Sequence, residues 1–411
     1  MFVEILHLGQ LMISVKEAFE TILTCVPRLP TETISLLKAT GRTLRQPVSA
    51  DRDLPPYDRV MMDGIAVRIE AFSGEKPVRL RIVGHQPAGS PPQELAHSAD
   101  CLEIATGAVL PAGADVIVPV EEITIAKGFA TVSEDYEPVS GRHVHHRGSD
   151  CKAGEQLLSE GMRLGAKEIA VGASCGAVNV QVATVPRVSI VSTGDELVDI
   201  VEMPQPHQIR RSNSHSLAAA LEASGLGRSE LTHFSDEPEM VSRGLEDLLP
   251  RMDVLVLSGG VSKGKKDYLP SALEALGIKK RFHWVSQRPG KPLWFGTGPS
   301  GQPIFALPGN PLSALICFHR YVAPALEKMA GWTRKTELAF PLAGPYVFKP
   351  PLTCFLPVRL KNGSAGLEAI PNPAGNSGDF TGILNTDGFV ELPPDETEFE
   401  TSSLVPFWPW Y

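Results

Sequence analysis

The sequence predicts a multi-domain chain of mixed class, α/β plus β, and three observations support this prediction. The chain has 411 residues, a length that is typical of about three domains. Between residues 186 and 331, apolar β runs alternate with amphipathic helices, which predicts a parallel sheet with helices on both faces. The regions before and after it carry short β runs between glycine and proline turns, which predicts β-rich units.

The first predicted element is a helix that begins after Ser14. Ser14 and Glu17 have the spacing of a capping box. Val15 and Ile22 then lie on one apolar face at helical intervals. Because this start is so well defined, we expect residues 1–11 to be a loose extension.

The region up to residue 185 has few helical signals. A basic, histidine-rich segment at residues 141–148 interrupts its β runs. The pattern predicts strands at residues 79–83, 116–120, 130–133 and 178–182, and a helix at residues 165–173.

The region from residue 186 to residue 331 has the clearest alternation of strands and helices. The predicted strands lie at residues 187–191, 230–234, 253–257, 282–285 and 304–307, and the predicted helices at residues 214–223, 238–248, 268–276 and 311–330. After Gly331 the pattern changes to strands and turns, so we expect a small β unit at the end of the chain.

Charge and composition exclude several classes of protein. The 38 basic and 47 acidic residues give a formal net charge of −9, which argues against general nucleic-acid binding and against attraction to anionic membranes. The longest uncharged stretch, residues 292–318, is broken by prolines, so we expect no membrane span there. Residues 1–15 lack the basic start of a secretory signal peptide. The six cysteines are scattered and form no CxxC, which favours neither a zinc site nor disulfides. We therefore expect a soluble, cytoplasmic protein.

Three loops that follow predicted strands carry unusual residues. They are the segments 192–196, 258–264 and 307–313, and ligands of open α/β sheets bind where such loops leave the carboxyl ends of strands. Glycine-rich turns and helix N-termini bind anions, and basic residues lie in or near these loops. This combination predicts a phosphorylated or otherwise anionic ligand, with candidate contacts at Thr193, Gly259, Gly260, Ser262, Arg288, Lys291, Pro308, Gly309, Asn310, Pro311 and Ser313.

The carboxylates of Asp195, Glu196, Asp236 and Asp267 also lie at these loops, where they would repel a phosphate unless a cation lies between them. Mg²⁺ is the natural candidate because it prefers oxygen ligands and bridges phosphates, and its candidate ligands are Glu196, Asp236 and Asp267. Purely structural readings remain open. Asn310 before Pro311 forms a good helix start, and Asp236 and Asp267 could simply cap helices.

Two further acidic loops lie in the β-rich region. Asp63 precedes Gly64 in a proline-stiffened turn, and Asp150 ends the histidine-rich segment. Either aspartate could be only a turn former. The histidines at positions 143, 145 and 146 have the alternation of surface strand residues, which does not favour metal binding.

The chain resembles the molybdopterin molybdenumtransferase family, bacterial MoeA and the gephyrin E-domain, from about Met12 to its end. The number, order and spacing of the matching motifs make the resemblance specific. They are Met62–Ala66, Ala105–Ala108, Arg147-Gly148-x-Asp150, Ser192–Leu197, Ser258–Ser262 with Asp267-Tyr268, Arg288–Pro292 and Leu307–Pro311.

The resemblance implies an elongated homodimer whose chain has four parts. Residues 12–52 and 140–185 would form an elongated N-terminal linking domain, and residues 53–139 a β-rich insertion domain. Residues 186–331 would form a three-layer α/β molybdopterin-binding domain, and residues 332–411 a C-terminal domain like a β-barrel.

The implied reaction inserts molybdate into adenylylated molybdopterin and releases AMP, with Mg²⁺ assisting. Asp236 and Asp267 would position the cation or the pterin phosphate, and Arg288 and Lys291 would hold anionic oxygens. The family acids that carry over are Asp63, Asp150, Glu196, Asp236 and Asp267, and further family site positions fall on Thr106, Pro308, Pro311, Ser313 and, less securely, Ser377. Of these, Glu196, Asp63 and Asp150 would orient the attacking oxygen or relay protons.

Some positions depart from the family pattern. The usual Asn-Ser-Ala-Met-Asp-Gly-Tyr is Arg59–Ile65 here, a frequent Glu is Ser149, and a frequent Lys is Arg288. The acids survive, so we favour an active enzyme that works with other proteins of molybdenum cofactor biosynthesis. The alternatives are a molybdopterin adenylyltransferase, which needs only the α/β unit, and a catalytically idle pterin-binding scaffold.

Overall fold

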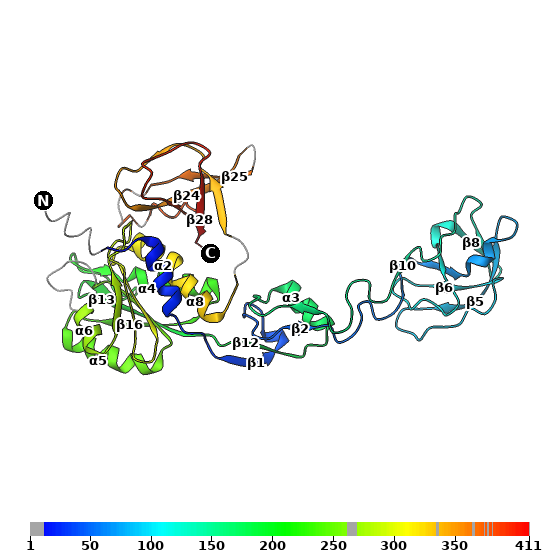
Figure 1. The fold of residues 1–411 in the computed structure, drawn as a ribbon, viewed down its shortest axis with the longest axis horizontal. Coiled ribbons are helices and arrows are strands. Elements are labelled where there is room, and N and C mark those ends of the chain that lie inside the picture. The colour runs from blue at the N-terminus through cyan, green and yellow to red at the C-terminus, as the bar shows by residue number, and fades with distance from the viewer. Residues whose placement is uncertain are drawn as a thin grey trace.

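The computed structural model describes residues 12–260, 269–333, 337–363, 366–373, 375, 378–379 and 381–410. The fold is elongated (Figure 1), with a β-rich insertion at one end, a narrow linking region in the middle and an α/β unit at the other end beside a C-terminal sheet. The expected extension at residues 1–11 and the candidate site residues Ser262, Asp267 and Ser377 lie outside the described residues.

The linking region is built from two segments that are far apart in the sequence. Buried Leu44, Leu158 and Val182 form part of its core. Two antiparallel pairs join the segments, β1 (Thr31–Ser35) with β12 (Asn179–Ala183) and β2 (Val48–Ser49) with β11 (Gln156–Leu158), next to helix α3 (Ala166–Ser174) and the short 3-10 helix η1 (Leu36–Lys38).

The insertion is a six-stranded sheet that buries both faces. Ile65 and Val67 belong to one apolar cluster and Ala66 to the other, because successive side chains of a strand point to opposite faces. A short pair, β3 (Arg59–Val60) with β10 (Val144–His145), lies where the chain enters and leaves it. The sheet has the order β7 (Val116–Pro119), β4 (Gly64–Val67), β6 (Asp100–Ile104), β5 (Arg79–Gln86), β9 (Phe129–Val132) and β8 (Ile123–Ala126), with 3-10 helices η2 (Ile69–Phe72) and η3 (Val120–Glu122).

The α/β unit contains a six-stranded sheet in the order β16 (Arg228–Phe234), β13 (Arg187–Thr193), β17 (Val254–Ser258), β21 (Pro303–Leu307), β20 (Trp294–Thr297) and β18 (Lys279–His283). The first four strands are parallel, as the alternation predicts. The fifth strand, β20, runs antiparallel to both of its neighbours, β21 and β18, which differs from the expected parallel sheet. The reason is local, because only residues 298–302 connect β20 to β21, and such a short connection makes a hairpin.

Helices cover both faces of this sheet. Val254 and Val256 pack toward α2 (Val15–Cys25), α4 (Ser212–Ser224), α7 (Pro311–Cys317) and α8 (Ala323–Ala330), whereas Leu255 and Leu257 pack toward α5 (Pro238–Leu248) and α6 (Leu269–Ala275). The capping box of Ser14 and Glu17 at the start of α2 is confirmed. The predicted helix at residues 311–330 is interrupted by a π-helical segment, η5 (Phe318–Val322). Smaller elements are β14 (Leu197–Val198), β15 (Ile209–Arg210) and η4 (Leu249–Arg251).

The C-terminal unit is a second sheet, which also takes up a strand of the preceding region. Its order is β19 (Gln287–Arg288), β24 (Thr353–Gly363), β26 (Gly388–Leu392), β28 (Leu404–Pro409) and β22 (Leu338–Pro341), with β25 (Gly366–Pro371) on β24 and a separate pair of β23 (Tyr346–Val347) and β27 (Glu398–Phe399).

The four-part division of the chain stays a prediction. Within it, α2 was assigned to the linking domain, yet Val15 and Ile22 of this helix are buried in the core of the α/β unit. No helix in the described part of the chain is long and apolar enough to span a membrane.

Candidate functional site

The three glycine-containing loops lie side by side at one edge of the α/β sheet. The parallel register pairs Ser192 with Ser258, and Ser258 with Leu307, so β13, β17 and β21 end at the same level. The loops that leave them therefore share one rim, where ligands of open α/β sheets bind.

Close backbone approach explains the two glycines after β17. Gly259 and Gly260 both have positive φ angles, 103° and 70°, which residues other than glycine rarely adopt. A Cβ atom would lie 3.0 Å from the Thr193 carbonyl oxygen at Gly259, and 3.2 Å from Thr193 Oγ1 at Gly260. The glycines thus let the β17 loop pack directly against the end of β13.

An asparagine that the sequence analysis did not single out ties these loops together. Asn213, near the start of α4, donates through Nδ2 to Ser258 Oγ at 2.9 Å and to the Gly309 carbonyl at 2.7 Å. No sequence motif surrounds Asn213, so its role in joining the loops is visible only in the folded structure.

Two hydroxyl groups at the end of β13 have no hydrogen-bond partner in the described part of the chain. Ser192 and Thr193 are 1% and 7% exposed, and neither Ser192 Oγ nor Thr193 Oγ1 has a hydrogen-bond partner among the described residues. Buried polar groups are normally paired. These hydroxyls are therefore candidate contacts for a ligand that reaches the end of β13.

Carboxylates occupy the β16 side of the same rim. The Asp236 N–H donates to Asp195 Oδ1 at 3.0 Å, which joins the loops after β16 and β13. The Glu196 side chain folds back over Gly194. Its Oε2 atom lies only 2.7 Å from the position that a Cβ atom on Gly194 would take. The candidate ligands Glu196 and Asp236 thus lie on two loops that are joined directly.

The donor set at this rim fits Mg²⁺. It consists of carboxylate and hydroxyl oxygens, and Mg²⁺ typically uses one or two carboxylates and completes its shell with water and phosphate oxygens. Within the described ranges, no three His, Cys, Asp or Glu side chains cluster as a metal site made of protein alone. A magnesium ion here would therefore need ligands from substrate or water.

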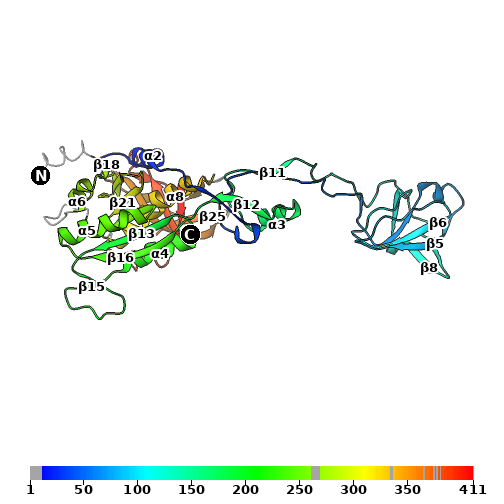
Figure 2. The ribbon, with the colours of Figure 1, turned by 90° about the horizontal axis from the view of Figure 1, so that it is seen from below.

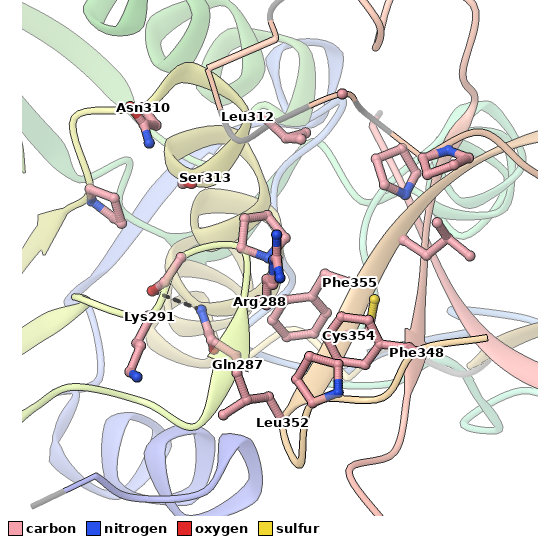
Figure 3. A pocket seen from close by; sticks show the side chains of 18 of the residues that line it. Gln287, Arg288, Lys291, Asn310, Leu312, Ser313, Phe348, Leu352, Cys354 and Phe355 are labelled. Atoms are coloured by element: carbon pink, nitrogen blue, oxygen red, sulfur yellow. Dashed lines mark hydrogen bonds between the residues drawn. The ribbon is translucent and has the colours of Figure 1, made fainter. Parts of the chain in front are cut away.

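A cavity of about 580 Å³ adjoins the rim, between the α/β unit and the C-terminal sheet. Its lining includes the cationic side chains Arg288, Lys291 and Lys349, and the described lining residues contain no Asp or Glu. Figure 3 shows Arg288 and Lys291 on one side and Cys354 and Phe355 on the other. Pro308, Asn310 and Ser313 also line it, so the third loop of the rim forms part of its wall.

The neutral groups of the cavity add no negative charge. Burial raises the pKa of the Cys354 thiol to about 12, and burial also raises the pKa of Tyr346. Both side chains therefore stay protonated at neutral pH. The cavity is suited to an oxyanion.

A buried glutamine shapes the turn that carries both cations. Gln287, which is 0% exposed, donates through Nε2 to the Gly290 carbonyl at 3.0 Å, the dashed line in Figure 3. The Tyr321 hydroxyl donates to Gln287 Oε1 from the other side. The parallel pairing of Arg288 with Cys354 then fixes the turn against the C-terminal sheet.

A largely buried ion pair joins the two units that form the cavity walls. Arg320 of the π-helical segment donates through Nε to Glu391 Oε2 at 2.8 Å, and Trp408 Nε1 donates to the same oxygen at 3.2 Å. Arg320 also lies over the ring of Trp408. This contact keeps the C-terminal sheet in place beside the α/β unit.

The acidic loops of the β-rich region form a second group. The Thr106 N–H donates to Asp63 Oδ1 at 2.7 Å, and this hydrogen bond lowers the pKa of Asp63 below its ordinary value. A Cβ atom on Gly64 would lie 2.0 Å from the Val118 carbonyl oxygen, which explains the glycine after the acid. Asp150 lies at the end of the segment that pairs with β3 and accepts from His145 Nε2 at 2.7 Å.

The two groups are far apart within one chain. Figures 1 and 2 both show the linking region between the insertion, which carries Asp63 and Thr106, and the α/β unit, which carries Glu196 and Asp236. Of the predicted site residues, the structure gathers Thr193, Glu196, Asp236, Gly259, Gly260, Arg288, Lys291, Pro308, Gly309, Asn310, Pro311 and Ser313 at the rim and cavity.

Three sequence families match the chain along its length. The MoeA N-terminal region (domain I and II) matches residues 13–176, a probable molybdopterin binding domain matches residues 189–328, and the MoeA C-terminal region (domain IV) matches residues 339–410.

Individual relatives cover nearly the whole chain. A molybdopterin molybdenumtransferase from Synechocystis sp. is 38% identical over 402 residues, 97% of this chain and 100% of the relative. One from Nostoc sp. is 36% identical and covers 82% of this chain and 78% of the relative. The crystal structure of a molybdopterin biosynthesis MoeA protein from Pyrococcus horikoshii superimposes with a TM-score of 0.80 at 30% identity, over 97% of this chain and 99% of that one.

Proposed function

This chain belongs to the molybdopterin molybdenumtransferase family and acts in molybdenum cofactor biosynthesis, and we propose that it transfers molybdenum in a site completed by a second copy of the chain. Molybdopterin and molybdate are its substrates. We further propose that molybdopterin arrives adenylylated, that AMP leaves and that Mg²⁺ assists. We also propose that the protein works as a homodimer in the cytoplasm.

The rim of the α/β sheet binds the nucleotide end of the pterin in this proposal. The hydroxyls of Ser192 and Thr193, which have no partner among the described residues, support hydrogen bonding with a ligand. The glycines after β17 let its loop pack directly against the end of β13, which brings the two loops together at this rim. Asn213 holds the loops at the spacing that this contact needs.

Glu196 and Asp236, with Asp267 of the same predicted set, would hold Mg²⁺. When bound, the ion would neutralise the charge that develops on phosphate oxygens as the bond to AMP breaks. The hydrogen bond from the Asp236 N–H to the Asp195 carboxylate joins the loops that carry Glu196 and Asp236, on the β16 side of the rim and away from the cationic cavity. In this arrangement the phosphate would contact the bound Mg²⁺, and molybdate would contact the cationic side chains of the cavity.

The cavity beside the rim binds molybdate in this proposal. Arg288 offers a planar, bidentate donor and Lys291 a compact positive charge, both suited to oxyanions. Ser313 can add a hydroxyl from the first turn of α7. The cavity shares Pro308 and Asn310 with the third loop of the rim, which brings molybdate close to the bound pterin.

Asp63 and Asp150 would come from the second copy of the chain. Within one chain they lie in the part that the linking region holds away from the rim (Figure 1). Asp63 stays ionised because Thr106 lowers its pKa, so it can accept a proton or orient an attacking oxygen.

The cationic cavity that opens onto the glycine-lined rim is the observation that carries this proposal. The test is to incubate the full chain with adenylylated molybdopterin, molybdate and Mg²⁺, and to measure AMP release and cofactor formation together. We expect both to depend on molybdate. Adenylylation of molybdopterin from ATP, without molybdate-dependent AMP release, would instead indicate an adenylyltransferase.

A further inference from the structure

The histidine-rich segment contributes one side chain that contacts a proposed catalytic acid. The antiparallel pairing of β3 with β10 places Arg59 directly opposite His145. Arg59 Nη2 lies 2.9 Å from His145 Nδ1, and His145 Nε2 lies 2.7 Å from Asp150 Oδ1. The three side chains form a continuous hydrogen-bonded row.

The chemistry of the row determines which ring nitrogen carries a proton. A guanidinium has only donors, so Arg59 must donate to His145 Nδ1, which then has no proton of its own. The single ring proton therefore lies on Nε2 and is donated to Asp150. The contact is a directed hydrogen bond from a neutral imidazole, and Arg59 determines its direction.

We propose that His145 is a positioning residue that orients the Asp150 carboxylate for the reaction, and that Arg59 acts through His145 by selecting its tautomer. The inference rests on the proposed function, in which Asp150 takes part in the chemistry. A hydrogen bond to Oδ1 restricts rotation of the carboxylate and leaves Oδ2 for the substrate. The Asp150 side chain is 57% exposed and that of His145 is 25% exposed, so the acid stays accessible while its partner is packed.

The neighbouring histidine supplies a matched control. His146 Nδ1 lies 3.5 Å from Asp58 Oδ1, and its side chain is 63% exposed. It follows His145 directly in the chain but does not contact Asp150 through any described hydrogen bond. The same substitution at the two positions therefore separates the proposed role from a general effect on this segment.

The first experiment measures molybdate-dependent AMP release by full-length variants. We expect H145L to lower kcat about tenfold, the effect of losing one hydrogen bond to a charged group. H145Q should recover most of the rate, because a glutamine amide can accept from Arg59 and donate to Asp150. H146L should match wild type. Thermal unfolding checks that all variants fold. Equal rates for folded H145L and wild type would overturn the proposal, as would an H145Q variant no better than H145L.

A second comparison tests whether Arg59 acts through His145. We expect R59L to slow the reaction, and the double variant R59L/H145L to be no slower than H145L alone. Losses that simply add would refute the tautomer role. D150N distinguishes this inference from the proposed function. An inactive D150N beside a fully active H145L refutes the inference alone. A fully active D150N removes Asp150 from the chemistry and also refutes the inference, whereas wild type without molybdate-dependent AMP release refutes the proposed function.

Discussion

Arg288 and Lys291 lie at the two ends of one tight turn, and both line the cavity, whose described lining residues include no carboxylate. An oxyanion bound in the cavity by either cation would make charge-assisted hydrogen bonds, which are stronger than neutral ones. We predict that R288Q and K291Q each weaken molybdate binding about tenfold. Isothermal titration of the full chain with molybdate measures this. K279Q, at an exposed lysine of β18, is the control and should bind like wild type. Unchanged binding in both cavity variants would exclude the cavity as the molybdate site.

Asp63 makes a pH-dependent contribution to stability. The Thr106 N–H lowers the pKa of the folded carboxyl, so the ionised form stabilises the fold above the unfolded-state pKa of about 3.9. This contribution is lost as the pH falls through the lowered folded pKa. We predict that D63A melts below wild type at pH 7 and that the difference closes under acidic conditions. Melting curves across pH test this, and a pH-independent difference would contradict it.

The residues of the site differ in how visible they are in the sequence. Asp63 beside a glycine, and the glycines after β17, stand out because their backbone conformations demand those residue types. Asn213 does not, because its two hydrogen bonds reach residues 45 and 96 positions away. Contacts at such separations arise only when the sheet brings distant loops together.

At the scale of elements, strand β4 begins at Gly64, where the neighbouring strand leaves no room for a side chain. Gly64 has a φ of 149°, and its Cβ position lies 2.0 Å from a carbonyl oxygen of the paired strand β7. We predict that G64A destabilises the protein by at least about 3 kcal/mol, because the strands must separate to admit a methyl group. G74A, where no atom lies within 4 Å, should stay within about 0.5 kcal/mol of wild type. Urea unfolding measures both, and equal stabilities would contradict this account of the turn.

Elements with strong local signals were predictable, and those that depend on pairing were not. The capping box at Ser14 and the proline start of α7 are confirmed because each depends on a few adjacent residues. Strand β20 was missed, although it lies in an uncharged stretch, because its strand character comes from pairing with β18 and β21. The π-helical segment is likewise not marked by any residue pattern that separates it from α7 and α8.

At the scale of the whole molecule, sequence periodicity predicts the α/β sheet but not the distance between the acidic loops and the rim. The elongated order of the parts was expected only from the family resemblance, and the structure has that shape (Figure 1). The pairing of β19 with β24 of the C-terminal sheet had no sequence signal, yet it brings Arg288 to the cavity wall. The separation of the two acid groups within one chain is the observation on which the proposal of a site shared by two copies rests.

The most direct test of this account uses mixed dimers of two inactive variants. One chain carries D63N and the other E196Q, each with a different affinity tag, and the doubly tagged dimer is assayed for molybdate-dependent AMP release. If each site takes Asp63 from one copy and Glu196 from the other, one site of the two is intact, and the mixed dimer should recover about half of the wild-type rate. A mixed dimer as inactive as either parent would contradict the shared site.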